Sequence, residues 1–429
     1  MRKMKDSGIP WIGEIPEGWN VIKAKQVMRN KSIKGYPHEE VLSLYREYGI
    51  VPKNSRDDNH NVTSEDTSSY KLVEVGDLVI NKMKAWQGSI AVSGYRGIIS
   101  PAYYICRLTN TAVYRGYIHY LLRNDSNKVE YLRLSTGLRV GQWDLNIEDF
   151  LNIPIVLPPT KEQRAIADFL DRKCSEIDEM VGLQERIIEE LKAYKQSVIT
   201  EAVTKGLDPN APMKDSGVEW IGEIPEGWEV ERTKNIIDTM DKGAGITKEE
   251  VFPDGDTPCV RYGEIYSKYN YSFCKCYSAT NLGMLSSHRF FEYGDLLSAG
   301  TGELVEEIGK TIAYLGDEKC LAGGDIIIIK HHQNPMFLSF ALNCHYAQAQ
   351  KSCSKAKLKV VHISASNIGD VVLALPPIEE QRAIASYLDR KCSDIDSLIR
   401  VRQDKVEALR EYKKAIIHEY VTGKKEVNH

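Results

Sequence analysis

Two long stretches of the chain carry apolar residues at helical spacing between charged positions. The apolar positions recur at mixed steps of three and four residues, the period of one buried face of an α-helix. Thr160 with Gln163 matches a capping box at the start of the first stretch, and Gly206 and Gly423 are typical of helix ends. The pattern predicts helices within residues 158–206 and 376–429, each of about 42 residues or roughly 60 Å.

An apolar stripe of this length on an otherwise charged helix has to be buried against another surface. Each helix is the most direct partner of the other, and because a globular region separates them along the chain, an antiparallel pair closes most simply. The alternative is that each helix packs on its own neighbouring domain. In the paired arrangement, the residues expected between the helices are Ile177, Val181, Ile188, Leu191, Val198, Ile395, Ile399, Val406, Leu409 and Ile416.

The helices belong to an internal repeat, the feature to seek before any fold assignment. "MKDSGIPWIGEIPEGW" from Met4 matches "MKDSGVEWIGEIPEGW" from Met213 at fourteen of sixteen positions. The helix block from Pro158 matches the one from Pro376 at sixteen of 24 positions. The first block, rich in Pro and Gly turns, favours neither helix nor strand. We interpret it as a connector that plugs into the helix pair through Trp11, Ile12 and Ile15 and, in the second copy, Trp220, Ile221 and Ile224.

Residues 20–157 and 229–375 differ between the two copies. Short runs such as "KLVEVGDLVI" and "GDIIIIK" predict strands, and "PMFLSFALNCHYAQA" is compatible with a short helix. The predicted architecture is α+β: two globular domains separated by a pair of long antiparallel coiled-coil helices, with a pseudo-two-fold internal repeat. The expected boundaries are a first domain with its connector at 1–157, a central helix at 158–206, a second connector and domain at 207–375, and a C-terminal helix at 376–429.

Composition excludes some classes of protein. The chain has 429 residues and a formal net charge of −4, which argues against indiscriminate coating of nucleic acid. Its nine cysteines are odd in number and lack the spacing of a disulfide framework, so reduced thiols are expected. Cys274 and Cys276 are likewise interpreted as ordinary thiols in preference to a metal site. Because no apolar run reaches membrane-span length and no signal region begins the chain, a cytoplasmic protein without a membrane partner is expected.

Several segments interleave cations with aromatic or amide side chains, a pattern typical of nucleic-acid contacts. Arg and Gln can read base edges, and Lys can meet phosphates. The alternatives for each segment are a solvated loop or a tyrosine-rich strand face in a core. Residues 20–157 contain 18 Lys and Arg against 14 Asp and Glu, whereas residues 229–375 contain 15 against 18, so charge alone does not identify the second domain as a binder. The candidates are Lys82, Lys84, Trp86, Arg139, Gln142 and Trp143 in the first domain, and Arg261, Tyr262, Tyr266, Lys268, Lys351, Lys355, Lys357 and Lys359 in the second.

No catalytic constellation stands out in the sequence. "EEIGKT" at 306–311 resembles the end of a phosphate-binding loop, but the preceding glycine, Gly302, is too far from Gly309 for that motif. A nucleotide-binding glycine fingerprint, a nucleophile elbow and the Asn/Asp-Pro-Pro-aromatic motif of amino-methyltransferases are all missing. We therefore expect a chain without catalytic residues, metal or cofactor of its own.

The layout resembles the specificity subunit of Type I restriction–modification enzymes. The resemblance is carried by "GIPWIGEIPEGW" and "GVEWIGEIPEGW" before the variable regions, and by "PPTKEQRAIADFLD" and "PPIEEQRAIASYLD" after them. It implies two target-recognition domains, each of which reads one half of a split, asymmetric site in double-stranded DNA, and a helix pair that fixes the unread spacer. It also implies two docked modification (methyltransferase) subunits and further restriction (helicase–nuclease) subunits. S-adenosylmethionine, ATP and Mg would then serve those partners.

A function of a different class stays open on the sequence alone. A two-headed scaffold could use the coiled coil as a spacer and bind proteins through both heads. Salt-sensitive binding to duplex DNA in the presence of a methyltransferase partner would separate this scaffold from a DNA reader. An enzyme with unrecognised catalytic residues would have to show turnover by the isolated chain.

Overall fold

The computed structural model describes residues 2–56, 63–64, 66–139, 142–302, 305–353 and 361–427. The chain divides into two compact units, Met1–Glu185 with Asp404–His429, and Arg186–Gln403. Two long helices run through these units: α4 spans Thr160–Lys205 and α9 spans Ile378–Val421. Each unit therefore contains one globular domain, the start of one long helix and the end of the other.

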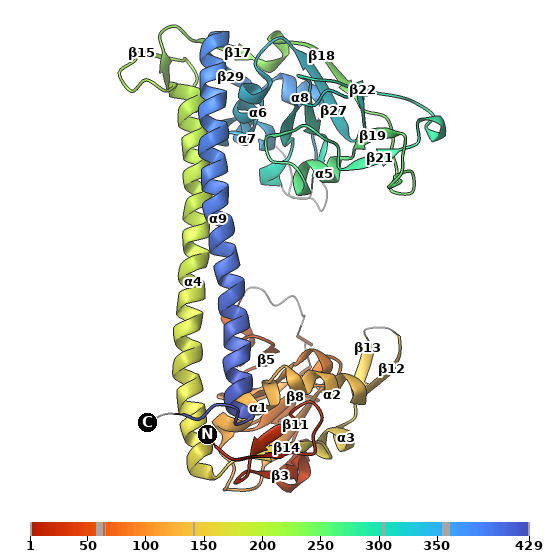
Figure 1. The fold of residues 1–429 in the computed structure, drawn as a ribbon, viewed down its shortest axis with the longest axis vertical. Coiled ribbons are helices and arrows are strands. Elements are labelled where there is room, and N and C mark those ends of the chain that lie inside the picture. Colours follow the sequence, from red (N-terminus) through yellow and green to blue (C-terminus); the bar gives the residue numbers. More distant parts are fainter. Residues whose placement is uncertain are drawn as a thin grey trace. The chain divides into compact units, whose positions relative to one another are not determined.

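In both units a segment of α4 lies antiparallel against a segment of α9 (Figure 1). In the first unit, Ile177 and Ile416 share one core cluster, and the rings of Phe169 and Tyr420 lie 4.4 Å apart. The antiparallel coiled-coil pair expected from the stripe is confirmed. Of the stripe residues, Val181, Leu191 and Leu409 are half-buried, and the buried ones are Ile177, Ile188, Val198, Ile395, Ile399, Val406 and Ile416.

Two ion pairs join the helices at equivalent positions of the repeat. In the first unit, Lys413 Nζ donates to both carboxylate oxygens of Asp178 at 2.6 Å. In the second unit, Lys195 Nζ donates to both carboxylate oxygens of Asp396 at 2.8 and 2.7 Å. Residues 178 and 396 are 218 positions apart, as are 195 and 413, which is also the offset between Pro158 and Pro376. The same helix register therefore occurs in both units.

Each connector forms a small antiparallel hairpin, so the expectation of a segment without strands is wrong. Strand β1 (Met4–Asp6) pairs with β2 (Glu14–Pro16), and β15 (Met213–Asp215) pairs with β16 (Glu223–Pro225). The connector isoleucines are buried, as expected of a plug: Ile12, Ile15, Ile221 and Ile224. Trp220, however, is 57% exposed, so the expectation that it belongs to the buried plug is wrong. The hairpin loop turns Ile221 inward and leaves Trp220 outside.

A tryptophan at the end of each connector docks on the start of a long helix. The indole nitrogen of Trp19 donates to Glu162 at 3.0 Å, and that of Trp228 donates to Glu380 at 2.9 Å. Both indoles are buried. The first connector also contacts the chain just after the end of α9. Gly423 there has φ +72°, and a Cβ on it would lie 2.5 Å from the ring of Pro16 in the connector. Glycine is needed there for its backbone conformation and for the close approach.

The start of α4 is held by tertiary contacts and does not form the predicted capping box. The hydroxyl of Thr160 donates to the carbonyl oxygen of Ala112 at 2.8 Å. Gln163 is buried, and its Oε1 accepts from the backbone nitrogen of Tyr114 at 2.7 Å. At the start of α9, the Oε1 of Gln381 accepts the corresponding bond from the backbone nitrogen of Asn334 in the second domain. Tyr114 directly precedes the domain helix that begins at Arg115, and Asn334 directly precedes the one that begins at Pro335, so each glutamine fastens a globular domain to a long helix.

The first domain is built on a four-stranded antiparallel sheet. Its order is β4 (Met28–Lys31), β11 (Tyr103–Leu108), β8 (Leu78–Asn81) and β9 (Ile90–Val92). The sheet packs with helices α1 (Arg115–Arg123), α2 (Ser126–Leu134) and α3 (Ile147–Leu151). Outside it lie the pairs β5 (Leu42–Tyr45) with β6 (Gly49–Pro52), β7 (Lys71–Val73) with β10 (Gly97–Ile99), β12 (Ser135–Arg139) with β13 (Gln142–Leu145), and β3 (Asn20–Lys23) with β14 (Pro154–Leu157).

The second domain repeats this sheet order and adds another sheet. Its first sheet runs β18 (Ile237–Lys242), β27 (Ile326–His331), β23 (Leu296–Ala299), β25 (Thr311–Tyr314) and β20 (Ser272–Phe273). Its second sheet runs β21 (Ser278–Thr280), β19 (Thr257–Val260), β26 (Cys320–Ala322) and β22 (Phe290–Phe291). The remaining elements are β17 (Glu229–Arg232) with β29 (Val372–Leu375), β24 (Thr301–Gly302) with β28 (Val361–His362), and helices α5 (Tyr262–Ser267), α6 (Pro335–Asn343), α7 (His345–Ser352) and α8 (Ala365–Gly369).

Candidate nucleic-acid interface

A two-stranded ribbon carries three of the candidates in the first domain. Strands β12 and β13 pair antiparallel, and Arg139 stands opposite Gln142 in their register. The register shifts between Thr136 and Arg139, which marks a bulge on the way to the tip. The structure thus brings the backbones of Arg139 and Gln142 together, while their side chains lie outside the described part of the chain. Trp143, on the next position of β13, is half-buried.

The base of this ribbon rests on the segment that contains the other first-domain candidates. The ring of Trp86 lies 5.2 Å from that of Trp143, edge to face, and its indole nitrogen donates to the carbonyl oxygen of Met83 at 3.0 Å. The Lys82 ammonium lies 4.6 Å from the Tyr104 ring centre. Trp86 and Trp143 therefore support the ribbon through packing. Lys84 is exposed and available to a phosphate.

In the second domain the candidates Arg261 to Lys268 form a short helix in place of the loop or strand considered from sequence. Glu264 caps α5, since its Oε2 accepts from the backbone nitrogen of Arg261 at 3.0 Å. Tyr262 and Lys268 are exposed. The hydroxyl oxygen of Tyr266 is buried and faces the interior near Gly302, which argues against a DNA contact through this hydroxyl, and the wider role expected of Tyr266 stays a prediction.

A cavity of about 830 Å³ opens beside α5. We call it the Tyr262 cavity. It collects side chains from four separate segments: a loop before β19, the helix α5, the loop leading into β21, and the turn after β26. Its lining residues are Ile246, Lys248, Val251, Arg261, Tyr262, Gly263, Glu264, Ser267, Lys268, Tyr277, Ser278, Gly323, Gly324 and Asp325. Sequence reasoning missed Lys248, which stands outside the cation–aromatic runs and reaches α5 only through the tertiary fold. Tyr277 ends the run that begins at Arg261, but the sequence did not single it out from the other tyrosines there.

Lys351 is not a phosphate contact. It lies near the end of α7, is 1% exposed, and its Nζ donates to the carbonyl oxygen of Gly309 at 2.7 Å. Burial lowers the pKa of this lysine to about 7. The burial of Lys351 removes it from the surface on which a phosphate could bind, and it does not test the single face expected for the later lysines of the run. Lys355, Lys357 and Lys359 lie outside the described residues.

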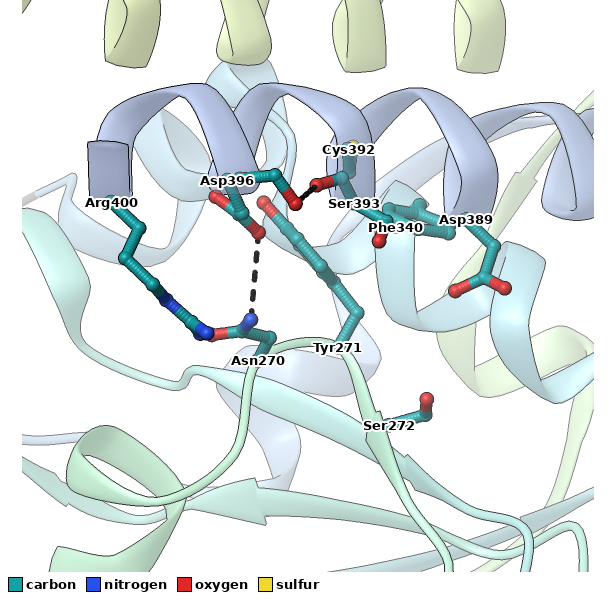
Figure 2. Close-up of a pocket in the computed structure, with 10 residues that line it drawn as sticks. Asn270, Tyr271, Ser272, Phe340, Asp389, Cys392, Ser393, Asp396 and Arg400 are labelled. Atoms are coloured by element: carbon teal, nitrogen blue, oxygen red, sulfur yellow. Dashed lines mark hydrogen bonds between the residues drawn. The ribbon is translucent and has the colours of Figure 1, made fainter. Parts of the chain in front are cut away.

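A smaller cavity, of about 280 Å³, lies between the second domain and α9 and is lined by residues of both (Figure 2). The carboxylate of Asp396 lines it from α9 and accepts two bonds from Lys195 and one, at 3.5 Å, from the side-chain amide of Asn270. The Lys195 ammonium also lies 5.1 Å from the Tyr271 ring centre. Because Lys195 of α4, Asn270 of the domain and Asp396 of α9 bond to one another here, we interpret this cavity as part of the joint between domain and helices.

Membrane and thiol features add little to the site. Among the helices in the described part of the chain, none combines the length and apolarity needed to cross a membrane. All nine cysteines are free thiols. Within the same described ranges, His, Cys, Asp and Glu do not gather in threes at metal-binding spacing.

Known proteins resemble this chain along nearly its whole length. The MjaVIII specificity subunit, a Type I restriction enzyme subunit of Methanocaldococcus jannaschii, is 26% identical over 437 residues, which cover 96% of this chain and 93% of that protein. The EcoKI specificity subunit of Escherichia coli K12 is 22% identical over 420 residues, with 90% and 84% covered.

Two solved structures share the fold. A chain from a structure of the assembly and conformational transition of the type I R-M system has a TM-score of 0.70 at 17% identity, covering 95% of this chain and 99% of that one. The HsdS subunit of Thermoanaerobacter tengcongensis has a TM-score of 0.50 at 18% identity, covering 95% and 98%. Residues 16–193 and 225–408 each match the Type I restriction modification DNA specificity domain. Because these matches span most of both repeats, the chain belongs to the Type I restriction–modification DNA specificity family.

Proposed function

We propose that this chain is the DNA sequence-specificity subunit of a Type I restriction–modification complex. One observation carries the proposal. The connectors and long helices form a duplicated frame, in which equivalent Trp–Glu bonds and Lys–Asp ion pairs recur in both repeats. This frame holds two domains with different exposed side chains. Two unlike readers on one repeated frame favour a bipartite, asymmetric DNA site, with one domain for each half. The helix pair would set the length of the unread spacer.

The first domain has an element of suitable size for reading bases. The major groove of B-DNA admits a two-stranded ribbon such as β12–β13, and Arg and Gln are the residue types that bond guanine and adenine edges in pairs. Arg139 and Gln142 are cross-strand neighbours near the ribbon tip, so they could address adjacent bases. The exposed Lys84 would hold the phosphate backbone beside the ribbon.

Catalysis would belong to partner subunits. Two modification subunits would dock on the helices and connectors and methylate DNA with S-adenosylmethionine, and restriction subunits would use ATP and Mg to translocate and cleave. This chain would contribute recognition and spacing, without a catalytic residue or a cofactor of its own. The duplicated frame supports two similar docking places for one kind of subunit.

The test is co-expression with a cognate modification subunit, followed by genome-wide mapping of methylated adenines. A bipartite asymmetric motif is expected. Arg139→Ala should relax one base position and weaken binding by about 1–3 kcal/mol. Arg29→Ala is the matched control, because Arg29 is an exposed arginine on another strand of the first domain. If Arg139→Ala leaves both the motif and the affinity as in the wild type, the ribbon is not the reader.

A further inference from the structure

The Tyr262 cavity concentrates positive charge in a domain that is acidic overall. Residues 229–375 contain 15 Lys and Arg against 18 Asp and Glu. Lys248, Arg261 and Lys268 nevertheless line this one cavity, together with only two acidic residues, Glu264 and Asp325. Of these two, Glu264 already accepts bonds from the backbone nitrogen of Arg261 and from the hydroxyl of Ser278. Arg261 and Glu264 form a long ion pair at 3.9 Å, but the three cations outnumber the two carboxylates, so the lining keeps a net positive charge that attracts an anionic ligand.

The same cavity presents two tyrosine rings that the protein core does not use. Tyr262 is 40% exposed and Tyr277 is 66% exposed, although both line a concave surface. The Lys268 ammonium lies 4.2 Å from the Tyr277 ring centre, so a cation and a ring are placed side by side. Exposed aromatic rings beside cations are the usual platform for an unstacked base, because every base has a π-face.

Arg261 adds an unsatisfied donor at this place. Its Nε–H is buried and donates no hydrogen bond to the described residues, and the nearest carboxylate oxygen, on Glu264, is 3.9 Å away. Buried donors are normally satisfied, so one that lines a cavity calls for an acceptor from outside the chain. A phosphate oxygen has the charge and the bonding capacity that an arginine selects.

We propose that the Tyr262 cavity binds a single nucleotide, with the base on Tyr262 and Tyr277 and the phosphate near Arg261, Lys248 and Lys268. Its volume lies within the range of about 300–1,000 Å³ usual for small-ligand sites. A duplex groove is read by protruding elements, whereas a nucleotide turned out of the stack needs a hollow of this kind. The nucleotide is either free or an extrahelical unit of the bound DNA, and the second source rests on the proposed function.

The first experiment tests binding of free nucleotides to the full chain. The four deoxynucleoside 5′-monophosphates and inorganic phosphate are titrated by calorimetry. Tyr262→Ala and Tyr277→Ala should each weaken nucleotide binding about 5- to 150-fold, the range of one lost stacking contact. Gly263→Leu should abolish it, because a Cβ at Gly263 meets nothing within 4 Å and the side chain would fill the cavity.

The matched control is Gly283→Leu. A Cβ at Gly283 likewise meets no neighbour within 4 Å, and this glycine does not line the cavity. Gly283→Leu should bind nucleotides as the wild type does. Equal melting temperatures of the two leucine variants would show that Gly263→Leu loses its ligand without losing its fold.

The second experiment tests DNA as the source, with the chain in complex with its modification subunits. Each base pair of the mapped site, other than those with the methylated adenines, is broken in turn by an abasic residue in one strand. If the cavity holds an extrahelical nucleotide, one such duplex should bind on the order of tenfold more tightly than the intact site, since the cost of unpairing is already met. Gly263→Leu should remove this gain.

The outcomes separate the two sources and the two proposals. Nucleotide binding without any tightening at an abasic position supports a free nucleotide, and tightening that Gly263→Leu abolishes supports the DNA source. No binding in the first experiment and no tightening in the second overturn the proposal. Failure of the complex to methylate or bind DNA would instead overturn the proposed function, and the calorimetry would still decide the cavity.

Discussion

The two equivalent ion pairs between α4 and α9 should contribute unequally to stability. Lys195 and Lys413 occupy the same position of the repeat and each donates two short bonds to an aspartate. Their surroundings differ. The side chain of Lys195 is 13% exposed and that of Asp396 is 34% exposed, against 29% for Lys413 and 61% for Asp178. The perturbation is Lys195→Met, with Lys413→Met as its matched control.

The expected magnitudes follow from this difference in burial. An exposed ion pair contributes about 0–1 kcal/mol, so Lys413→Met should cost about 0.5 kcal/mol. Removing one partner of a fully buried pair costs about 3–5 kcal/mol, because the other charge is left without compensation. The Lys195 pair lies between these limits and also loses its contact with the Tyr271 ring at 5.1 Å. Lys195→Met should therefore cost about 2 kcal/mol.

Native-state hydrogen exchange followed by mass spectrometry measures the effect locally, in peptides that contain each lysine and its partner. A loss of about 2 kcal/mol corresponds to roughly 30-fold faster exchange around Lys195 and Asp396, and a loss of about 0.5 kcal/mol to roughly twofold around Lys413 and Asp178. Added salt should shrink the smaller effect first. Equal acceleration in the two variants, or a larger one for Lys413→Met, would refute the argument from burial.

Two further predictions concern the second domain and the helix pair. Burial lowers the pKa of Lys351 to about 7, from the ordinary lysine value of 10.5. Between these two pH values the unfolded chain therefore binds more protons than the folded chain. The free energy of unfolding should then rise with pH across that window. Urea titrations should show a flatter rise for Lys351→Met, and a variant that keeps the pH dependence of the wild type would contradict this prediction. Inserting about one helical turn, roughly 5.4 Å, after Leu183 in α4 should change the spacer of the methylated motif and neither half-site, and an unchanged spacer on methylome mapping would argue against a helix pair that sets it.

The long helices were predictable because their signal is local. The apolar stripe from Ile177 to Val198 repeats with the helical period, and a stripe needs a partner whatever the rest of the fold. The limits of α4 at Thr160 and Lys205 agree with the expected start and stop. The capping box failed because the Thr160 hydroxyl bonds to Ala112 and the Oε1 of Gln163 bonds to Tyr114, and no window of sequence around the helix start contains these partners.

The binding surface was less predictable, because its members are brought together by distant segments. Lys351 belongs to a basic run, yet its ammonium bonds to a carbonyl 42 positions away. The Tyr262 cavity depends on Lys248, which lies outside any motif, and on Tyr277, which is one of several tyrosines in the run after Arg261. Composition could mark Arg261 to Lys268 as a candidate, but burial decides which of its tyrosines is available.

The duplicated residues and the divergent ones differ in what constrains them. Trp19 and Glu162 are 143 positions apart and bond at 3.0 Å, so the loss of Glu162 would leave the buried indole nitrogen of Trp19 without its acceptor. Trp228 and Glu380 carry the same constraint in the second repeat. The exposed Lys84 side chain has no such partner among the residues that the structure describes, so each domain can vary side chains of this kind while the connectors and helix starts stay fixed. This division of constraint explains why the two copies agree in their connectors and helix starts, and why two different DNA half-sites could be read from one frame.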